Sequence, residues 1–416
     1  MRGLPARATY LRMERIDTDI LIAGGGIAGL LASAVLAEIG FDVICADPVP
    51  PVTDGAAAGA DTRSTAFLMP SVQLLERAGL WPRLAAHAAP LRIMRIVDAS
   101  APEGALETAD FVSDDIDQPA FAYNLPNWLI RREVLAHLQT RANAQLLAPC
   151  RVEGMLARSS GAIVTLSGNR QLRAPLVIAA DGRNSPLRKA AGIAAKKWSY
   201  GQKALVFVVH HPDLPHENVS TEVHKSGGPF TLVPLPDAHQ SAVVWMATGP
   251  EIAALNTLDD AAFGQAATAR SAHVLGALTL VAGRATWPII AQQAARLDGP
   301  RLALLAEAAH VIPPIGAQGL NMSLADLAAL AGLLAEARNA GQDIGAPALL
   351  ARYSRARLPD MAARIAGVDA LNRASMASAA PLHDLRRQGL KLLHGVKPLR
   401  KAAMFAGLGA GARQAP

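Results

Sequence analysis

The sequence predicts an α/β protein with a Rossmann-like parallel-sheet domain, an inserted antiparallel-sheet domain and a helical C-terminus. The first observation behind this prediction is a set of three short apolar runs, each of which leads into a turn or loop, as buried parallel strands do. These runs are residues 19–23, 174–180 and 302–307. The second is residues 201–248, where short strand-like segments alternate with Gly, Pro and Asp turns, as in antiparallel sheets.

Residues 24–29 form the most informative motif in the chain. Gly24, Gly26 and Gly29 follow the first apolar run as G-x-G-x-x-G, and Ile27 and Ala28 begin a helix-spaced apolar series. Gly24 allows a tight turn, Gly26 lets the backbone approach a pyrophosphate, and Gly29 lets the helix pack on the strand. The free N–H groups at such a helix start attract an anion. This strand–turn–helix context predicts a dinucleotide-binding site.

The second strand of the same unit is expected at residues 41–46, and Asp47 stands at its end. A carboxylate here accepts hydrogen bonds from both hydroxyls of an adenosine ribose, while its charge disfavours a 2′-phosphate. Arg63, in the loop that follows, suits a phosphate, although a solvated loop arginine explains it equally well. Arg131, at an expected helix start, either faces the cofactor or forms a surface pair with Arg132.

The second and third apolar runs lead into two further segments of interest. Asp181-Gly182 ends the second run, where a carboxylate can cap the N–H groups of a tight turn. After the third run and Pro313-Pro314, residues 316–321 open a long helix. Because a glycine-bearing helix start offers free N–H groups and the positive end of the helix dipole, we expect it to stabilise negative charge on a reduced ring or an oxyanion.

The remaining segments predict a mainly antiparallel second domain. A helix is expected at residues 255–280 and a β-meander at 146–173. Strands are expected at 203–211, 218–224, 230–234, 241–247 and 285–290, with edge strands and turns within 91–123. Five histidines match no metal-ligand spacing and are expected to be scattered over the surface: His210, His211, His216, His224 and His239.

Composition favours a globular enzyme. The 416 residues have room for two or three domains, and 51% of them are hydrophobic. No apolar run reaches the roughly 18 residues of a membrane span, so a soluble, cytoplasmic protein is expected. Cys45 and Cys150 have neither ligand nor disulfide spacing and are expected to be buried in a reducing compartment. Residues 1–13 carry no pattern, and Met13 is an alternative start.

With these three motifs in this order, the sequence resembles the FAD-dependent aromatic hydroxylases of the p-hydroxybenzoate hydroxylase type. It is most similar to the branch that hydroxylates polyprenyl-phenols in ubiquinone biosynthesis, and the resemblance covers residues 17–403. It rests on Gly24-x-Gly26-x-x-Gly29 with Asp47, on Asp181-Gly182-x-x-Ser185-x-x-Arg188, and on Ala306-Glu307-Ala308-Ala309-His310 with Pro313-Pro314 and Gly316-x-Gln318-Gly319-x-Asn321.

The resemblance implies an FAD-binding domain in three parts, interrupted by a substrate domain. FAD-binding segments are implied at 17–85, 126–198 and 291–340, substrate-domain segments at 86–125 and 199–290, and a helical region with the basic tail at 341–416. The residues expected at FAD are Gly24, Gly26, Ile27, Ala28, Gly29, Asp47, Arg63, Arg131, Asp181, Glu307, Gly316, Gly319, Leu320 and Asn321. The backbone of Pro313, Pro314 and Gly319 is expected at the reactive edge of the flavin, and no acid–base residue is assigned.

The sequence departs from the family pattern in two places. The usual Gly-Asp pair of the ribityl motif is Ala306-Glu307 here. Glutamate keeps the carboxylate but adds a methylene, so it must reach the ribityl chain from a backbone set further back. The second departure is Asp47, where the family more often has glutamate. FAD binding is still expected.

The activity implied by the resemblance is hydroxylation of the ring of a lipophilic polyprenyl-phenol. Reduced FAD would react with O₂ to give a C4a-hydroperoxide that attacks the ring, with electrons from NAD(P)H or a ferredoxin-type reductant. The protein would exclude water from this intermediate and stabilise charge on the flavin. Two alternatives stay open: a hydroxylase of another small aromatic compound, or a non-catalytic FAD-binding scaffold of a quinone-biosynthesis complex. A flavin dehydrogenase or halogenase of the same fold is a further alternative within the enzymes, but a halogenase needs a lysine-bearing motif beyond the glycine turn, and the sequence has none.

The formal net charge of +6 is concentrated in the tail at residues 385–416, which hold seven basic and no acidic residues. This distribution argues against nucleic-acid binding by the core and for a local electrostatic contact. Because a polyprenyl substrate resides in the bilayer, the tail is expected to contact the inner membrane peripherally or a quinone-biosynthesis complex. An ordinary solvated basic end is the alternative.

Overall fold

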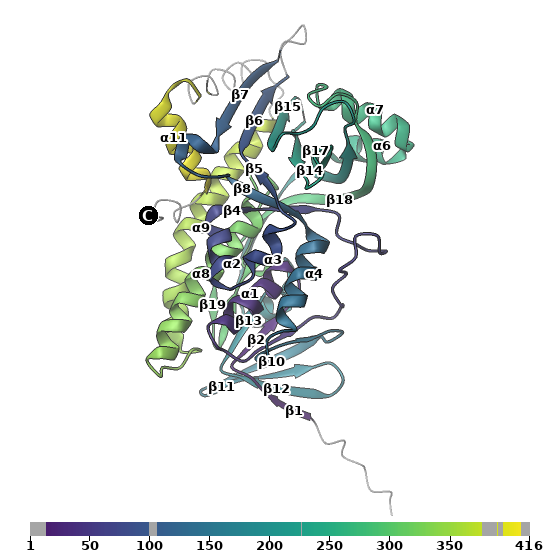
Figure 1. Ribbon diagram of the computed structural model, residues 1–416. Helices are drawn as coiled ribbons and strands as arrows, with labels where there is room; N and C mark the ends of the chain where they lie inside the picture. Colours follow the sequence, from purple (N-terminus) through teal and green to yellow (C-terminus); the bar gives the residue numbers. More distant parts are fainter. Residues whose placement is uncertain (1–13, 100–105, 226, 377–388, 390–393, 409–416) are drawn as a thin grey trace, which may run out of the picture.

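The computed structural model describes residues 14–99, 106–225, 227–376, 389 and 394–408. A parallel-sheet domain lies in the middle of the elongated molecule, with a small meander at one end and a large antiparallel sheet at the other (Figure 1). The long helix α9 (Pro347–Met376) runs alongside the parallel-sheet domain and reaches the antiparallel sheet. The predicted α/β class and the two kinds of sheet are confirmed.

A six-stranded sheet with the order β19-β20-β13-β2-β3-β9 forms the centre, and its neighbours from β20 to β9 are parallel. The strands are β2 (Ile20–Ala23), β3 (Val43–Ala46), β9 (Ala144–Leu147), β13 (Leu176–Ala179), β19 (Asp298–Gly299) and β20 (Leu302–Leu304). Both faces of this sheet are covered, which explains why β2 and β13 are continuous apolar runs. The third predicted strand ends at Leu304, not at Glu307.

Helices from distant parts of the chain pack around this sheet in one hydrophobic core. They are α1 (Ile27–Glu38), α2 (Met69–Arg77), α3 (Trp81–Ala85), α4 (Asn127–Leu138), α5 (Pro186–Ala190), α8 (Gln318–Asn339) and α9. The buried Tyr353 of α9 donates its hydroxyl to Leu304 O at 2.8 Å. Thus α9 belongs to the same core, although it follows the predicted boundary at residue 340.

The meander predicted at residues 146–173 is confirmed. It consists of β10 (Val152–Arg158), β11 (Gly161–Leu166) and β12 (Arg170–Ala174), and β1 (Glu14–Asp17) joins β12 in parallel. A separate three-stranded sheet, β4-β8-β5, lies between the two domains. Its strands are β4 (Ser64–Leu68), β8 (Ala122–Pro126) and β5 (Ala89–Leu91).

The large sheet has eight strands in the order β21-β18-β14-β17-β16-β15-β6-β7. They are β6 (Ile93–Asp98), β7 (Glu107–Val112), β14 (Ala195–His210), β15 (Val219–His224), β16 (Pro229–Pro234), β17 (Gln240–Thr248), β18 (Thr279–Ala294) and β21 (His310–Val311). A 3-10 turn, η2 (Ser113–Ile116), follows β7. The predicted helix at 255–280 is wrong in extent, because α6 (Gly249–Thr257) and α7 (Asp260–Arg270) replace it and β18 already starts at Thr279.

The two faces of the large sheet pack against different partners. Phe207, Trp245 and Phe263 form an aromatic cluster between the outer face and helices α6 and α7. The inner face, which contains Val206, meets Ile315 in the loop before α8. Side chains alternate along β14, so one set packs against α6 and α7 on the outer face and the other set points toward the parallel-sheet domain on the inner face.

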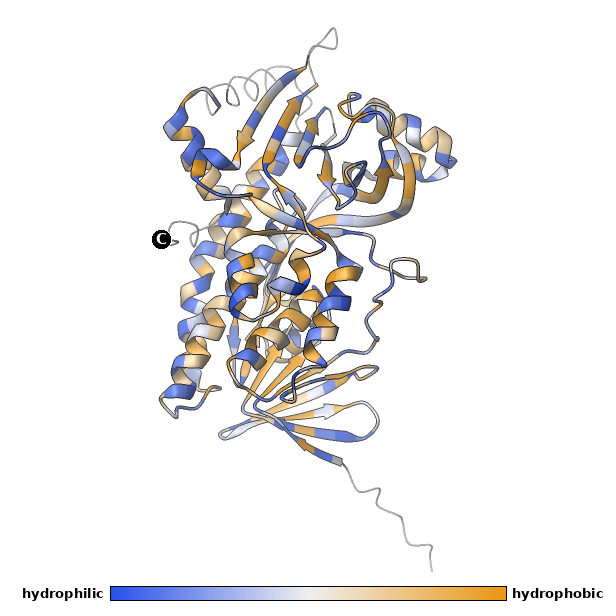
Figure 2. Cartoon of the chain, viewed as in Figure 1, coloured by the Kyte–Doolittle hydropathy of each residue, from blue (hydrophilic) through white to orange (hydrophobic). Residues whose placement is uncertain are grey.

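Apolar residues gather on the parallel strands and on the inner sides of the helices (Figure 2). Within the part of the chain that the structure describes, α8 alone has the length and hydropathy of a membrane-spanning helix. More than half of its apolar window is buried inside the protein, as in the core helix of a globular domain. Cys45 and Cys150 are buried free thiols, as expected, and burial raises the pKa of Cys45 to about 12.

The interpretation of the histidines as scattered surface residues is wrong for His211 and His216, which are buried, and for His224, whose side chain is 13% exposed. The rings of His211 and His216 contact the backbone carbonyl groups of Leu214 and Leu235 at 2.7 and 2.9 Å. The His216 contact ties the turn before β15 to the β16–β17 hairpin. Burial lowers the pKa of His211, so the neutral ring is favoured there.

Candidate cofactor-binding and active site

The three sequence motifs meet at the carboxyl edge of the parallel sheet. β2, β13 and β20 are adjacent and parallel, and they end at Ala23, Ala179 and Leu304. Parallel strands end at a common edge of the sheet, so the segments that follow them lie side by side. This holds although the ends of β2 and β20 are about 280 residues apart in the sequence. In open α/β sheets, ligands bind in the crevice outside this edge.

The three motif glycines have different environments. A Cβ added at Gly24 or Gly29 would lie 2.3 or 1.9 Å from a backbone oxygen, so the fold itself requires both glycines. Gly26 is exposed, and an added Cβ would meet no protein atom within 4 Å. The N-terminus of α1, at Ile27 and Ala28, has no side-chain cap. The turn therefore leaves an open cradle of backbone N–H groups, which fits a pyrophosphate.

Asp47 lies beside this turn. Its two carboxylate oxygens accept hydrogen bonds from Gly25 N at 2.6 Å and Val49 N at 2.8 Å. Each oxygen keeps a further lone pair. The carboxylate is therefore held in a fixed position and can still accept from the ribose hydroxyls for which the sequence analysis selected it.

Asp181 supplies a second acceptor at the sheet edge. Its Oδ2 accepts Leu187 N at 3.3 Å, as expected for a capping carboxylate, and its buried Oδ1 has no hydrogen-bond partner among the described residues. Burial raises the pKa of this carboxyl group. A buried acceptor without a donor is unfavourable unless a ligand supplies one, and the hydroxyl groups of FAD are suitable donors.

Residues 306–308 form a 3-10 turn, η3 (Ala306–Ala308), next to Asp181. Glu307 Oε2 accepts Arg183 Nε at 3.2 Å, and its side chain is 47% exposed. Arg188 NH1 donates to Ala308 O at 2.8 Å and so joins the second motif to the third. Glu307 thus stands at the edge of the site with its carboxylate held by Arg183, within a segment locked to the Asp-Gly turn.

Arg63 and Arg131 converge on Asp61. Arg63 forms a bidentate pair with Asp61, both contacts 2.7 Å long, and Arg131 reaches the same carboxylate at 3.4 Å. Burial opposes ionisation of Asp61, but its hydrogen bonds with Arg63 and Asn127 leave its pKa lowered. The Arg63 guanidinium also lies 4.5 Å from the ring centre of Trp287. Arg63 is therefore anchored in its loop, although its side chain stays 36% exposed, and its contact with a phosphate remains a prediction.

Of the two neighbouring arginines in α4, Arg131 contacts Asp61 at 3.4 Å, whereas Arg132 pairs with Glu133 at 2.9 Å. Sequence reasoning did not single out Trp287 as a partner of Arg63, because β18 approaches the loop only in the folded protein. The one signal available was the acid–base pair Asp61-x-Arg63.

The start of α8 closes the other side of the site. Gly316 and Ala317 have φ angles of +62° and +55°, and Ala317 provides no side-chain cap. Pro314, Gly316 and Gly319 are exposed, whereas Pro313 is buried. The N–H groups around Gly319 and Leu320 lack intrahelical acceptors, because they belong to the first turn. They form an anion-stabilising helix start of the kind expected for a reduced flavin.

The side chain of Asn321 is engaged within the protein. Its Oδ1 accepts Leu68 N at 2.9 Å and Ser71 Oγ at 2.7 Å, while Nδ2 donates to Ala66 O at 2.8 Å and Ala317 O at 2.6 Å. These four bonds use the full capacity of the amide. The side chain therefore holds β4 against α8 instead of binding the cofactor.

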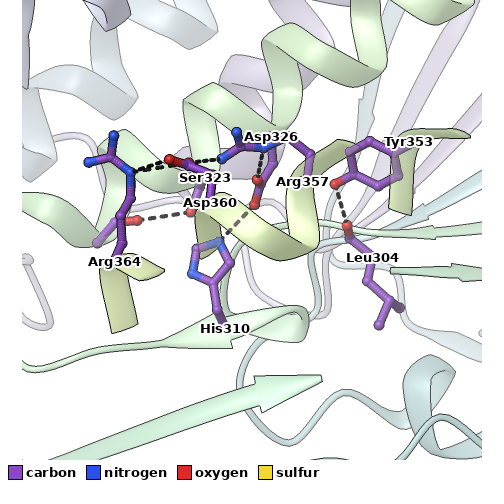
Figure 3. A network of polar contacts seen from close by, with 9 residues as sticks. Leu304, His310, Ser323, Asp326, Tyr353, Arg357, Asp360 and Arg364 are labelled. Atoms are coloured by element: carbon purple, nitrogen blue, oxygen red, sulfur yellow. Dashed lines mark hydrogen bonds and ion pairs between the residues drawn. The ribbon is translucent and has the colours of Figure 1, made fainter. Parts of the chain in front are cut away.

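A polar network joins His310 of β21, Asp326 of α8 and residues of α9 (Figure 3). Asp326 is fully buried between His310 Nε2 at 2.8 Å and Arg357 Nε at 2.6 Å. Arg357 continues to Asp360, which also binds Arg364. Arg364 NH1 then donates to Gln318 Oε1 at 2.9 Å, at the first residue of α8. The network thereby fixes the loop between β21 and α8 from both ends.

Replacing Gly26 by valine tests the cradle. We expect Gly26→Val to abolish FAD binding, because the added methyl groups occupy the space that the pyrophosphate needs. The same change should leave the unfolding temperature of the apoprotein within a few degrees of the original, because no protein atom is displaced. Gly29→Val is the matched control, and its clash with Gly24 O should destabilise the apoprotein itself. A full flavin spectrum in purified Gly26→Val protein would contradict this role of the turn.

Ala306 tests the departure in the ribityl motif. Its φ of +56° is unfavourable for a residue with a Cβ, by roughly 1–2 kcal/mol. Ala306→Gly should therefore raise the free energy of unfolding by about 0.5–1 kcal/mol after the greater flexibility of the unfolded glycine chain is counted. Ala309→Gly, at a φ of −91°, is the control and should lower it. Urea unfolding of the two variants decides the matter, and destabilisation by Ala306→Gly would disprove strain at this position.

Comparison with known proteins agrees with this geometry. The sequence profile of the family described as FAD binding domain matches residues 17–366. Ubiquinone hydroxylase UbiL of Rhodospirillum rubrum is 34% identical over 391 residues, which cover 94% of this chain and 89% of that protein. The 3-demethoxyubiquinol 3-hydroxylase of Escherichia coli is 28% identical over 400 residues, covering 95% of this chain and 100% of that protein.

A solved structure of similar fold is p-nitrophenol 4-monooxygenase PnpA from Pseudomonas putida, with a TM-score of 0.78 at 19% identity. The alignment covers 95% of this chain and 99% of that chain. The structural likeness confirms the fold, and the profile match together with the UbiL similarity confirms the family. This chain therefore belongs to the FAD-dependent aromatic hydroxylases of the p-hydroxybenzoate hydroxylase type and is an FAD-dependent monooxygenase.

Proposed function

We propose that this protein hydroxylates the aromatic ring of a polyprenyl-phenol intermediate of ubiquinone biosynthesis. The observation that carries the proposal is the convergence of the three motifs on one edge of the parallel sheet, beneath the apolar inner face of the large sheet. Relatives that align over nearly the whole chain are named ubiquinone hydroxylases, which supports this substrate class.

FAD supplies the redox chemistry and the activation of O₂, with electrons from NAD(P)H or a ferredoxin-type reductant. The residues of the chain would position the cofactor. The start of α1, which has no side-chain cap, would bind the pyrophosphate, and Asp47 would bind the ribose. Asp181 and Glu307 would bind the hydroxyls of the ribityl side. The start of α8 would stabilise negative charge on the ring. The apolar cluster that joins Val206 and Met246 with Ile315 would help to exclude water.

Deletion of the gene in the source organism, followed by mass spectrometry of quinone precursors, tests the proposal. We expect a prenylated phenol that lacks one ring hydroxyl or its methoxy derivative to accumulate. Expression of the wild-type chain should remove it, whereas Gly26→Val should not, because that variant lacks the cofactor. Unchanged ubiquinone content with no accumulated precursor would refute the assignment, and the position of the missing oxygen would identify the ring carbon.

We also propose a peripheral contact of the basic tail with the cytoplasmic surface of the inner membrane, where the substrate resides. Most of the range 385–416 lies outside the described residues, but α11 (Lys397–Leu408) is described. Met404 of α11 is buried against the protein. Leu399 of α11 and the preceding Val396 are 41% and 42% exposed, and the exposed Lys397 lies next to them in the chain. Exposed apolar side chains next to a basic residue suit an anionic lipid surface or an acidic partner of a biosynthetic complex.

Cosedimentation with phosphatidylglycerol vesicles distinguishes the lipid from the protein partner. The double variant Lys397→Glu with Leu399→Ser should bind at least about ten-fold more weakly, because charge reversal and lost burial each contribute on the order of 1 kcal/mol or more. Leu371→Ser, an exposed leucine of α9, is the control and should bind normally. Equal binding of all three proteins, or binding that high salt does not weaken, would exclude the membrane contact.

A further inference from the structure

A contact between a glutamate and a histidine on the inner face of the large sheet has no part in the three motifs. Glu222 and His224 alternate along β15, and His224 Nε2 lies 2.8 Å from Glu222 Oε1. Their side chains are only 20% and 13% exposed, so the pair is not an ordinary surface salt bridge. His224 Nδ1 is buried and has no hydrogen-bond partner among the described residues. A largely desolvated charge of this kind needs a reason.

Strand register gives the position of Glu222. Residues paired across neighbouring strands point to the same face of the sheet. Val206 pairs with Val244, Val244 with Thr231, Thr231 with Glu222, and Glu222 with Ile96. These five residues therefore form one row across β14, β17, β16, β15 and β6. Glu222 stands about 10 Å from Val244, because two strand spacings separate them.

The two ends of this row pack in two different apolar clusters. Val206 and Val244 belong to the apolar cluster that contains Ile315, in the loop that leads into the α8 start. Ile96, at the other end, packs on the cluster that contains Leu68 of β4, and Leu68 N donates to Asn321 of α8. Glu222 thus lies on the face directed at the flavin side of the molecule, between two apolar contacts that flank the start of α8.

We propose that Glu222 determines substrate specificity by accepting the hydrogen bond of the phenol hydroxyl, and that His224 positions its carboxylate. This inference rests on the proposed function. A prenylated phenol is apolar except for its ring oxygens, so a single acceptor in an apolar surface can orient it. A hydrogen bond to a carboxylate also increases electron density on the ring, which favours electrophilic attack. His224 holds Oε1 and leaves Oε2 for the substrate.

The same arrangement disfavours substrates that carry a carboxylate. A benzoate group placed near Glu222 would experience like-charge repulsion in a partly desolvated site. The expected substrate class is therefore a prenylated phenol without a ring carboxylate.

Ligand binding to the FAD-loaded full-length protein tests this inference. The change in flavin absorbance on titration reports the binding. The probes are 2-geranylphenol, its methyl ether, and 3-geranyl-4-hydroxybenzoate. The wild-type protein should bind the phenol at least about ten-fold more tightly than either other probe, the low end for a hydrogen bond to a charged group. In Glu222→Leu the preference over the ether should fall to within about two-fold, with FAD content and ether affinity unchanged.

Further variants separate positioning from folding. Glu222→Gln keeps an acceptor without the charge and should show an intermediate preference. His224→Leu should reduce the preference, and His224→Gln, which keeps a donor for Oε1, should restore most of it. Glu133→Gln removes a carboxylate from an ion pair on α4 and should behave as wild type.

Two results would count against the inference in distinguishable ways. Turnover of 2-geranylphenol with an undiminished preference over its ether in Glu222→Leu would overturn the role of Glu222 while leaving the proposed function intact. Failure of the FAD-loaded wild-type protein to bind or oxidise any of the three probes would contradict the proposed function itself, and the inference with it.

Discussion

The parallel pairing of β2, β13 and β20 is the constraint on which the site depends. It brings the glycine turn, the Asp-Gly turn and the 3-10 turn at Ala306 to one edge of the sheet, although the three motifs are far apart in the sequence. The ladder continues past the strand ends, since Ala180 N donates to Ala23 O and Leu305 N to Ala179 O. Each motif is therefore held by its neighbour's backbone, and the cofactor surface is rigid before any ligand arrives.

Buried charge extends this rigidity to the start of α8. Asp326 has no access to solvent, and its carboxylate contacts His310 and Arg357. Breaking such a pair from one side typically costs about 3–5 kcal/mol, although the intact pair adds little to stability compared with an apolar core. Its effect is geometric, because it joins the segment after β20, helix α9 and Gln318 into one unit. This support fixes the position of the N–H groups at the start of α8, which are expected to stabilise charge on the flavin ring.

Local chemistry could be predicted from the sequence, and long-range chemistry could not. The glycine turn, the capping role of Asp181 and the strand–turn pattern of the large sheet depend on neighbours in the chain, and the structure confirms them. The clamp made by Asn321, the stacking of Arg63 on Trp287 and the burial of His211 depend on residues far away. No local pattern distinguishes a histidine that hydrogen-bonds a distant carbonyl from one that faces water. Glu222 is of the same kind, since only register shows which face it occupies.

The departure at Ala306-Glu307 illustrates how the same fold accommodates a changed motif. Ala306 occupies a left-handed conformation that glycine would adopt without strain. The turn is nevertheless kept, because Ala306 O accepts Ala309 N and Arg188 holds Ala308 O from the neighbouring motif. Glu307 then projects far enough to meet Arg183, so its longer side chain is stabilised by a partner on the Asp-Gly turn. The backbone is thus determined by the surrounding contacts and not by the glycine, and the carboxylate stays at the site although its connection to the chain has lengthened.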